Sequence, residues 1–201
     1  MGEVFNKQEE AEKLIGGLEN KIQLIKERTR SVSDKEKANV IIYATENYLM
    51  GKKSIQSYFL TEILNANNLV PDGESDFIKV SEEQLLKYNP DVLVVIGHEG
   101  YLDTSTIYDG KQCGINWGNV KELKAIKNKR VVSLGYEEWR ATMETPIGLL
   151  KMAKAIYPDK FKDIDIPSEE LKMYMEDYKF SKDEALKAVE AQKFISNMEV
   201  K

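Results

Sequence analysis

The sequence contains very few of the side chains on which metal and redox chemistry depend. Its 201 residues include a single cysteine, Cys113, and a single histidine, His98. One cysteine excludes an internal disulfide and a multi-cysteine metal site, and one histidine means that a catalytic dyad would have to use His98. The GxGxxG, P-loop, GxSxG and HExxH motifs are absent, which removes the common signatures of nucleotide-binding proteins, serine hydrolases and zinc proteases.

The sequence also lacks an excess of basic residues and any long apolar run. There are 29 lysines and arginines against 34 aspartates and glutamates, so the net charge is −5 and no nucleic-acid-binding surface is expected. No run approaches the roughly 18–20 apolar residues that cross a bilayer. The polar start, MGEVFNKQEEAEK, lacks the apolar region of a signal peptide. We therefore expect either a cytoplasmic protein or a chain from which a leader has been removed.

What the sequence does contain is a clear helix–strand unit at residues 81–99, SEEQLLKYNPDVLVVIGHE. Ser81 and Gln84 have the spacing of a capping box at the start of a helix. Pro90 ends this helix, because the residue before a proline disfavours the helical conformation. The apolar, β-branched run 92–96 then predicts a strand buried on both faces of a parallel sheet.

The rest of the chain alternates strands and helices. Expected strands lie at 39–45, 77–80, 92–96 and 130–134. Expected helices lie at 4–30, 54–65, 81–88, 120–126, 145–156, 168–178 and 181–196. The order predicts a doubly wound α/β fold with a mainly parallel sheet of about four to five strands, preceded by a long helix and followed by two C-terminal helices. The segment 100–118 is a long loop, and loops of this length are usually functional.

Aromatic and polar residues gather where the expected strands end. Carboxyl ends of strands are the edge at which open α/β sheets bind ligands, and several aromatics at one edge favour an apolar pocket with few polar groups. The candidate ligand contacts are Tyr43, Tyr48, His98, Glu99, Tyr101, Trp117, Trp139 and Arg140. Arg140 would pair with an anionic ligand. Taken singly, each aromatic is also explained by local packing and Arg140 by solvation.

The pair His98 and Glu99 has three interpretations that the residues leave open. It can be an acid–base pair, a set of ligand contacts, or two strand-end residues that face water. Cys113 lies in the loop within reach of His98, so a Cys–His nucleophile is a further alternative, although nothing local supports it. A small apolar loop residue explains Cys113 equally well.

Four stretches resemble the solute-binding proteins that serve iron–siderophore, haem and cobalamin ABC importers. VSEEQLLKYNPDVLVVIG resembles the family's helix–strand unit, and FNKQEEAEKLIGGLENKIQLIKERT resembles the long helix that joins its two lobes. AIKNKRVVSLGYEEW resembles the last strand with its pocket loop, and TPIGLLKMAKAIYPDKFKDIDI resembles a helical segment near the C-terminus. The four stretches occur in the family's order and together cover most of the chain.

The resemblance implies a division of the chain and a function. Residues 4–30 would be the interlobe helix and residues 38–201 the C-terminal lobe, with the N-terminal lobe absent. The protein would be an extracytoplasmic substrate-binding component without catalytic residues, metal ligands or a resident cofactor. It would hold a metal complex, such as a ferric siderophore, haem or cobalamin, between two lobes.

The resemblance also singles out Glu83. The family docks on its ABC permease through one glutamate per lobe, and Glu83 occupies the matching position in the helix before the Pro-Asp strand. Without the resemblance, the helix dipole alone explains a carboxylate in this first turn.

Two functions of other classes remain as alternatives. A small stand-alone α/β enzyme would use His98 and Glu99 as acid and base. A helix-mediated dimerisation module would use the long helix, because exposed apolar stripes tend to associate. A lone lobe would leave such a stripe without its partner lobe, at Val4, Phe5, Ala11 and Leu14.

Overall fold

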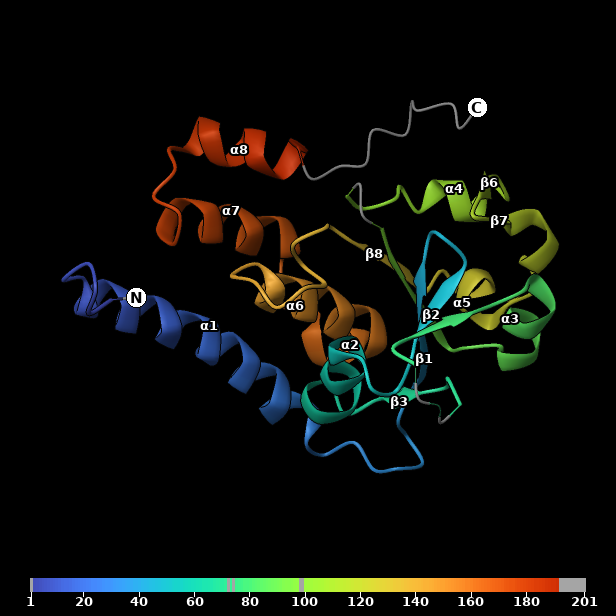
Figure 1. Ribbon diagram of the computed structural model, residues 1–201. Coiled ribbons are helices and arrows are strands. Elements are labelled where there is room, and N and C mark those ends of the chain that lie inside the picture. Colours follow the sequence, from blue (N-terminus) through green and yellow to red (C-terminus); the bar gives the residue numbers. More distant parts are fainter. Residues whose placement is uncertain (1, 72, 74, 98–99, 192–201) are drawn as a thin grey trace.

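A six-stranded sheet forms the centre of the protein (Figure 1). The structure is a computed structural model that describes residues 2–71, 73, 75–97 and 100–191. The hydrogen-bonded strand order is β4-β2-β1-β5-β8, and β3 pairs with the start of β1. The strands of this sheet are β1 (Asn39–Ala44), β2 (Tyr48–Met50), β3 (Asn67–Asn68), β4 (Phe77–Lys79), β5 (Val92–Ile96) and β8 (Val131–Leu134).

The middle of the sheet is parallel, as the sequence predicts. β1 pairs with β5 from Val40 opposite Val92 to Ala44 opposite Ile96, and β5 pairs in the same direction with β8. All five residues of β5 are buried, because helices cover both faces of the sheet and the β-branched run has no polar face to expose. The edge differs from the prediction, since β2 pairs antiparallel with β1 and β4 pairs antiparallel with β2.

Helices lie on both faces of the sheet, so the predicted doubly wound α/β fold is confirmed (Figure 1). One face carries α1 (Gln8–Thr29), α2 (Ile55–Tyr58), η1 (Phe59–Ile63), α6 (Thr145–Ile156), α7 (Ile166–Glu176) and α8 (Lys182–Ala191). The other face carries α3 (Glu82–Tyr88), α4 (Ser105–Tyr108), η2 (Trp117–Val120) and α5 (Lys124–Lys127). The remaining short elements are β6 (Gln112–Cys113), β7 (Ile115–Asn116) and η3 (Pro158–Phe161).

Alternate residues of β1 feed the two cores. Ile42 and Ala44 pack under α1 and α6, while Ile41 and Tyr43 pack under α3 and η2. This alternation follows from the period of two in a strand. The alternation also determines which face of the sheet each side chain at the end of a strand lies on, and hence which of these side chains can contact the same ligand.

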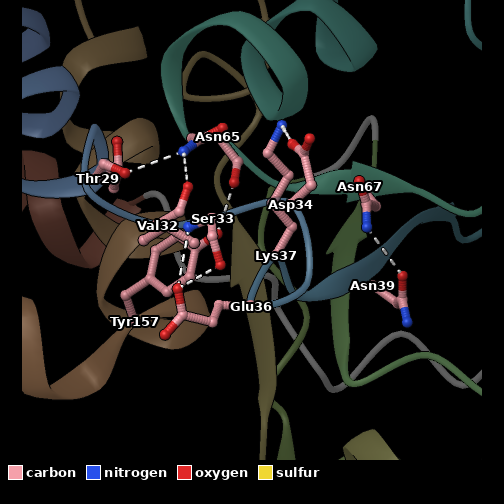
Figure 2. A network of polar contacts seen from close by, with 10 residues as sticks. All are labelled: Thr29, Val32, Ser33, Asp34, Glu36, Lys37, Asn39, Asn65, Asn67 and Tyr157. Atoms are coloured by element: carbon pink, nitrogen blue, oxygen red, sulfur yellow. Dashed lines mark hydrogen bonds and ion pairs between the residues drawn. The ribbon is translucent and has the colours of Figure 1, made fainter.

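The end of α1 is tied to the lobe by a polar network (Figure 2). Asn65 follows η1 with a left-handed backbone (φ 51°), and its side-chain amide donates to the carbonyls of Thr29 and Val32, both at 3.0 Å. The Tyr157 hydroxyl donates to the carbonyl of Asn65 at 2.6 Å. Nearby, Arg28 forms two hydrogen bonds with the Asp163 carboxylate, at 2.6 and 2.8 Å. The last turns of α1 therefore have a fixed orientation against the sheet.

Several expected elements have a different form in the structure. The helix expected at 54–65 begins as α2 and continues as the π-helical η1. The loop expected at 100–118 contains α4 and the β6–β7 hairpin. The helix expected at 181–196 is present as α8, at Lys182–Ala191. Residues 192–196 of the expected helix lie outside the described residues. Within the described ranges, no helix combines the length and apolar character needed to cross a membrane.

Candidate ligand-binding site

A cavity of about 200 Å³ opens where β1 and β5 end. Ala44 and Ile96 are the last residues of these two strands. The parallel strand β3, which is reached after β2, α2 and η1, pairs with β1 on one side, whereas β5 pairs with β1 on the other side. The cavity therefore lies at the switch point of the sheet, where open α/β folds bind ligands. Its lining consists of Ala44, Glu46, Tyr48, Phe77, Ile96, Gly97 and Trp139.

Trp139 is a wall of the cavity that its neighbours hold in place. Its indole nitrogen donates to the carbonyl of Gly97 at 3.3 Å, and the Gln56 side chain donates to the carbonyl of Trp139 at 2.9 Å. The ring of Tyr136 meets the indole edge-on, with centroids 6.0 Å apart. The side chain is therefore ordered independently of a ligand, which lowers the entropy lost on binding.

Two further aromatic walls come from the antiparallel edge of the sheet. Tyr48 lies opposite Ala44 in the β1–β2 pair, and Phe77 lies opposite Met50 in the β2–β4 pair. Tyr48 is 37% exposed and Phe77 is 51% exposed. Such large exposed rings at a concave site are typical of a surface that contacts a ligand or a second domain.

A buried charge cluster lies behind the cavity wall, in the segment that carries Trp139. The Lys151 ammonium is 2.5 Å from a carboxylate oxygen of Glu138 and 2.5 Å from one of Glu170. Glu138 also accepts a hydrogen bond from the backbone of Gly135 at 2.8 Å. The cluster fastens the β8–α6 segment, which carries Trp139, to α6 and α7.

Burial changes the protonation of this cluster. Two carboxylates share one ammonium, and burial raises the pKa of Glu138 to about 7, although Lys151 opposes this shift. Burial lowers the pKa of Lys151, but the attraction of Glu138 and Glu170 outweighs burial and leaves that pKa above its ordinary value. The ammonium therefore stays charged, and Glu138 takes up a proton at a higher pH than an exposed glutamate does.

Tyr43 and Trp117, two of the predicted ligand contacts, belong to the core on the other face of the sheet. Their rings meet edge-on with centroids 5.1 Å apart, and both side chains are fully buried. The Tyr43 hydroxyl donates to Asn47 and the Trp117 indole to the carbonyl of Cys113. Because Tyr43 precedes Ala44 by one residue, it points to the opposite face, and neither ring offers a ligand an exposed surface.

The other predicted contacts divide between the cavity and its surroundings. Tyr48 and Trp139 line the cavity. Arg140 instead lies over the ring of Tyr136, 4.6 Å from its centroid, and donates to the Tyr136 hydroxyl. Tyr101 lies beneath the ammonium of Lys151 at 5.5 Å. The predicted His98 and Glu99 lie outside the described residues.

Sequence reasoning missed Glu46, Phe77 and Gly97 as lining residues. Glu46 and Gly97 directly follow the ends of β1 and β5, so their positions were a usable signal. Phe77 had no such signal, because it reaches the cavity only through antiparallel pairing of two three-residue strands.

Glu83, the predicted docking residue, lies exposed in the first turn of α3. The predicted capping box of Ser81 and Gln84 is present at the start of this helix. The neighbouring Glu82 accepts hydrogen bonds from the backbone of Asn116 and the side chain of Asn119. No hydrogen bond or ion pair joins the Glu83 side chain to any residue in the described part of the chain, so its carboxylate is accessible on the surface of α3.

Comparison with known proteins identifies related chains. A family profile described as "Periplasmic binding protein" matches residues 1–137. The molybdate-binding protein MolA of Haemophilus influenzae is 25% identical over 187 residues, which are 90% of this chain and 50% of that protein. The chain therefore spans half the length of this relative.

In the described ranges, no group of three or more histidine, cysteine, aspartate or glutamate side chains is placed to hold a metal ion.

Solved structures share the fold over most of the chain. A periplasmic solute-binding protein from Veillonella parvula has a TM-score of 0.74 and 23% identity, covering 92% of this chain and 56% of its own. The Helicobacter pylori protein Ceue with Ni(II) bound has a TM-score of 0.65 and 21% identity, covering 89% of this chain and 56% of its own. At these identities the similarity establishes the fold.

Proposed function

The chain belongs to the periplasmic binding protein family, and we propose that it forms one lobe and the connecting helix of the substrate-binding component of an ABC importer. The observation that carries the proposal is the aromatic cavity at the switch point of the sheet. This cavity is open on one side, as expected of half a site that a second lobe closes. The protein would work outside the cytoplasm and catalyse no reaction, since MolA and the protein from Veillonella parvula are described as binding proteins.

For the ligand we propose a metal complex, with a ferric siderophore first and haem or cobalamin as alternatives. Molybdate and Ni(II), which the names of two related proteins contain, support a metal-containing ligand without choosing among them. The three aromatic walls favour an organic shell around the metal over a bare ion, because apolar cavities bind organic surface.

A ligand screen tests the binding part of the proposal. Thermal shift and titration calorimetry on a two-lobe protein that includes this chain would compare ferric siderophores, haem, cobalamin and molybdate. We expect one class to raise the melting temperature in a concentration-dependent way, because a ligand that binds only the folded state stabilises it. If none of the four classes binds the two-lobe protein, the transport function is contradicted.

For permease docking we propose Glu83, which would pair with an arginine of the transporter as the family resemblance implies. Glu83→Gln should lower transport while leaving ligand affinity unchanged, because the side chain lies on α3, on the other face of the sheet from the α6 side that carries Trp139. Glu82→Gln is the matched control, since it removes the same charge from the same helical turn. Equal transport losses in both variants would assign the effect to the helix start as a whole and not to Glu83.

A further inference from the structure

We propose that the cavity at the ends of β1 and β5 binds a positively charged organic group, not an oxyanion. This inference rests on the proposed binding function and adds the charge and shape of the ligand part that enters this lobe. It follows from the walls of the cavity, from the charges around it and from its size.

The walls are suited to a cation with an apolar body. Trp139, Tyr48 and Phe77 come from three different segments and all face the same cavity. The faces of aromatic rings carry negative electrostatic potential, so they attract ammonium-type cations placed over them, and tryptophan does so most strongly. An oxyanion gains nothing from these surfaces and loses its hydration on entering.

The charges around the cavity also favour a cationic ligand. Glu46 is the charged residue in the described lining, which contains no lysine or arginine. No hydrogen bond or ion pair holds the Glu46 side chain to another described residue, so its charge remains available. Lys79 lies opposite Tyr48 in the β2–β4 pair, but its exposed side chain is not part of the lining.

Arg140 and Lys151, two further cations near this edge, already have aromatic or anionic partners. Arg140 stacks on Tyr136, and Lys151 is held by Glu138 and Glu170 behind the wall. A molybdate-like ligand would therefore enter a site whose described lining residues offer a carboxylate and no positive charge. Anion sites in proteins instead rely on arginine, lysine or converging backbone N–H groups.

The size of the cavity fits one compact group. A volume of about 200 Å³ is smaller than the roughly 300–1,000 Å³ of pockets that enclose a drug-sized ligand. A trimethylammonium group with a short tail is small enough to enter it. A larger ligand would place such a cationic arm here and extend the remainder toward the open side.

A pair of probes that differ only in charge tests the inference on the 201-residue chain. Choline and its neutral carbon isostere, 3,3-dimethylbutan-1-ol, have nearly the same shape, and molybdate serves as the anion. Ligand-observed NMR titration should show choline binding at least about fivefold tighter than the isostere, because only choline gains from the rings and from Glu46. Molybdate should show no binding.

Three variants assign the effect to the cavity. Glu46→Gln and Phe77→Leu should each weaken choline about threefold to tenfold and leave the isostere unchanged, since they remove the charge or the ring but little volume. Glu62→Gln is the control, because it removes an exposed carboxylate from η1, away from the cavity lining. Circular dichroism would confirm that each variant is folded.

The possible outcomes separate this inference from the proposed function. Equal binding of choline and the isostere, or choline binding that Glu46→Gln leaves intact, overturns it. If choline does not bind at concentrations up to about 100 mM, the inference is also overturned. This concentration lies far above the dissociation constants of small ligands that fit their sites well. Molybdate binding would overturn the cation preference while supporting the transport function.

Discussion

Lys151 is the residue that neutralises the buried charge behind the cavity wall. Lys151→Met should lower the free energy of unfolding by about 3–5 kcal/mol above about pH 8, because it leaves Glu138 and Glu170 buried without an ammonium. Urea denaturation followed by circular dichroism measures this change. Because Trp139 is one residue from Glu138, the same variant should also weaken ligand binding.

Lys127→Met is the matched control for the Lys151 prediction. Lys127 forms an ion pair of the same length, 2.5 Å, with Glu122, but both side chains are exposed. Exposed ion pairs contribute about 0–1 kcal/mol, so this variant should unfold almost like the wild type. Similar losses in both variants would mean that burial of the Lys151 cluster is not the cause.

Glu138 gives the stability of the protein a specific pH dependence. Its pKa is raised from 4.5 to about 7 by burial, so between these values the folded state holds a proton that the unfolded state releases. The free energy of unfolding contributed by Glu138 therefore falls as the pH rises from about 4.5 to about 7. Glu138→Gln stays neutral and should remove this part of the slope in urea denaturation across that pH range. An identical slope in the variant would contradict the assignment.

At the scale of elements, the connection between α1 and the sheet depends on Asn65. Asn65→Ala loses two hydrogen bonds and puts a residue that tolerates the left-handed conformation less well than asparagine at this position, so we expect the free energy of unfolding to fall by about 2–4 kcal/mol. Asn65→Gly loses the same hydrogen bonds without the strain and should be about 1–2 kcal/mol more stable than the alanine variant. Hydrogen exchange should show faster opening of the last turn of α1 in both. If the glycine variant were no more stable than the alanine variant, the left-handed backbone conformation would not contribute to the loss of stability.

Elements with a strong local signal were predictable from the sequence. The β-branched run of β5 and the proline at the start of α6 match the structure, with β5 at Val92–Ile96 and α6 at Thr145–Ile156. The expected strand at 77–80 is β4 at Phe77–Lys79, whereas β2 was not predicted, because three residues are too few for an alternating pattern to be read. What the sequence did not indicate is how β2 and β4 pair. Their antiparallel pairing depends on contacts between distant segments, and no local pattern reveals it.

The candidate site was predictable only in part, for the same reason. The rule that ligands bind where parallel strands end directed attention to Tyr48 and Trp139, which line the cavity. The rule does not say which face a strand-end residue takes, and Tyr43 and Trp117 pack in the opposite core. Phe77 reaches the cavity through tertiary pairing and had no sequence signal.

At the scale of the whole molecule, the N-terminal turn before α1 and the N-terminal half of α1 present an apolar surface. Val4 and Phe5 are 80% and 69% exposed, and Ile15 is also exposed, whereas the C-terminal half packs against the lobe through Ile25. Without a covering lobe, such a surface favours association. We expect the sedimentation coefficient of the 201-residue chain to rise with concentration, and Phe5→Ser to reduce that rise. A monomer at every concentration would contradict helix-mediated dimerisation.

The two tryptophans report from opposite faces of the sheet. Trp117 is fully buried in one core, whereas Trp139 forms a wall of the cavity. Indole emission shifts with the polarity of its surroundings, so a ligand that enters the cavity changes the fluorescence of Trp139 and leaves that of Trp117 constant. The protein thus carries its own optical sensor of occupancy, with an internal reference in the same chain.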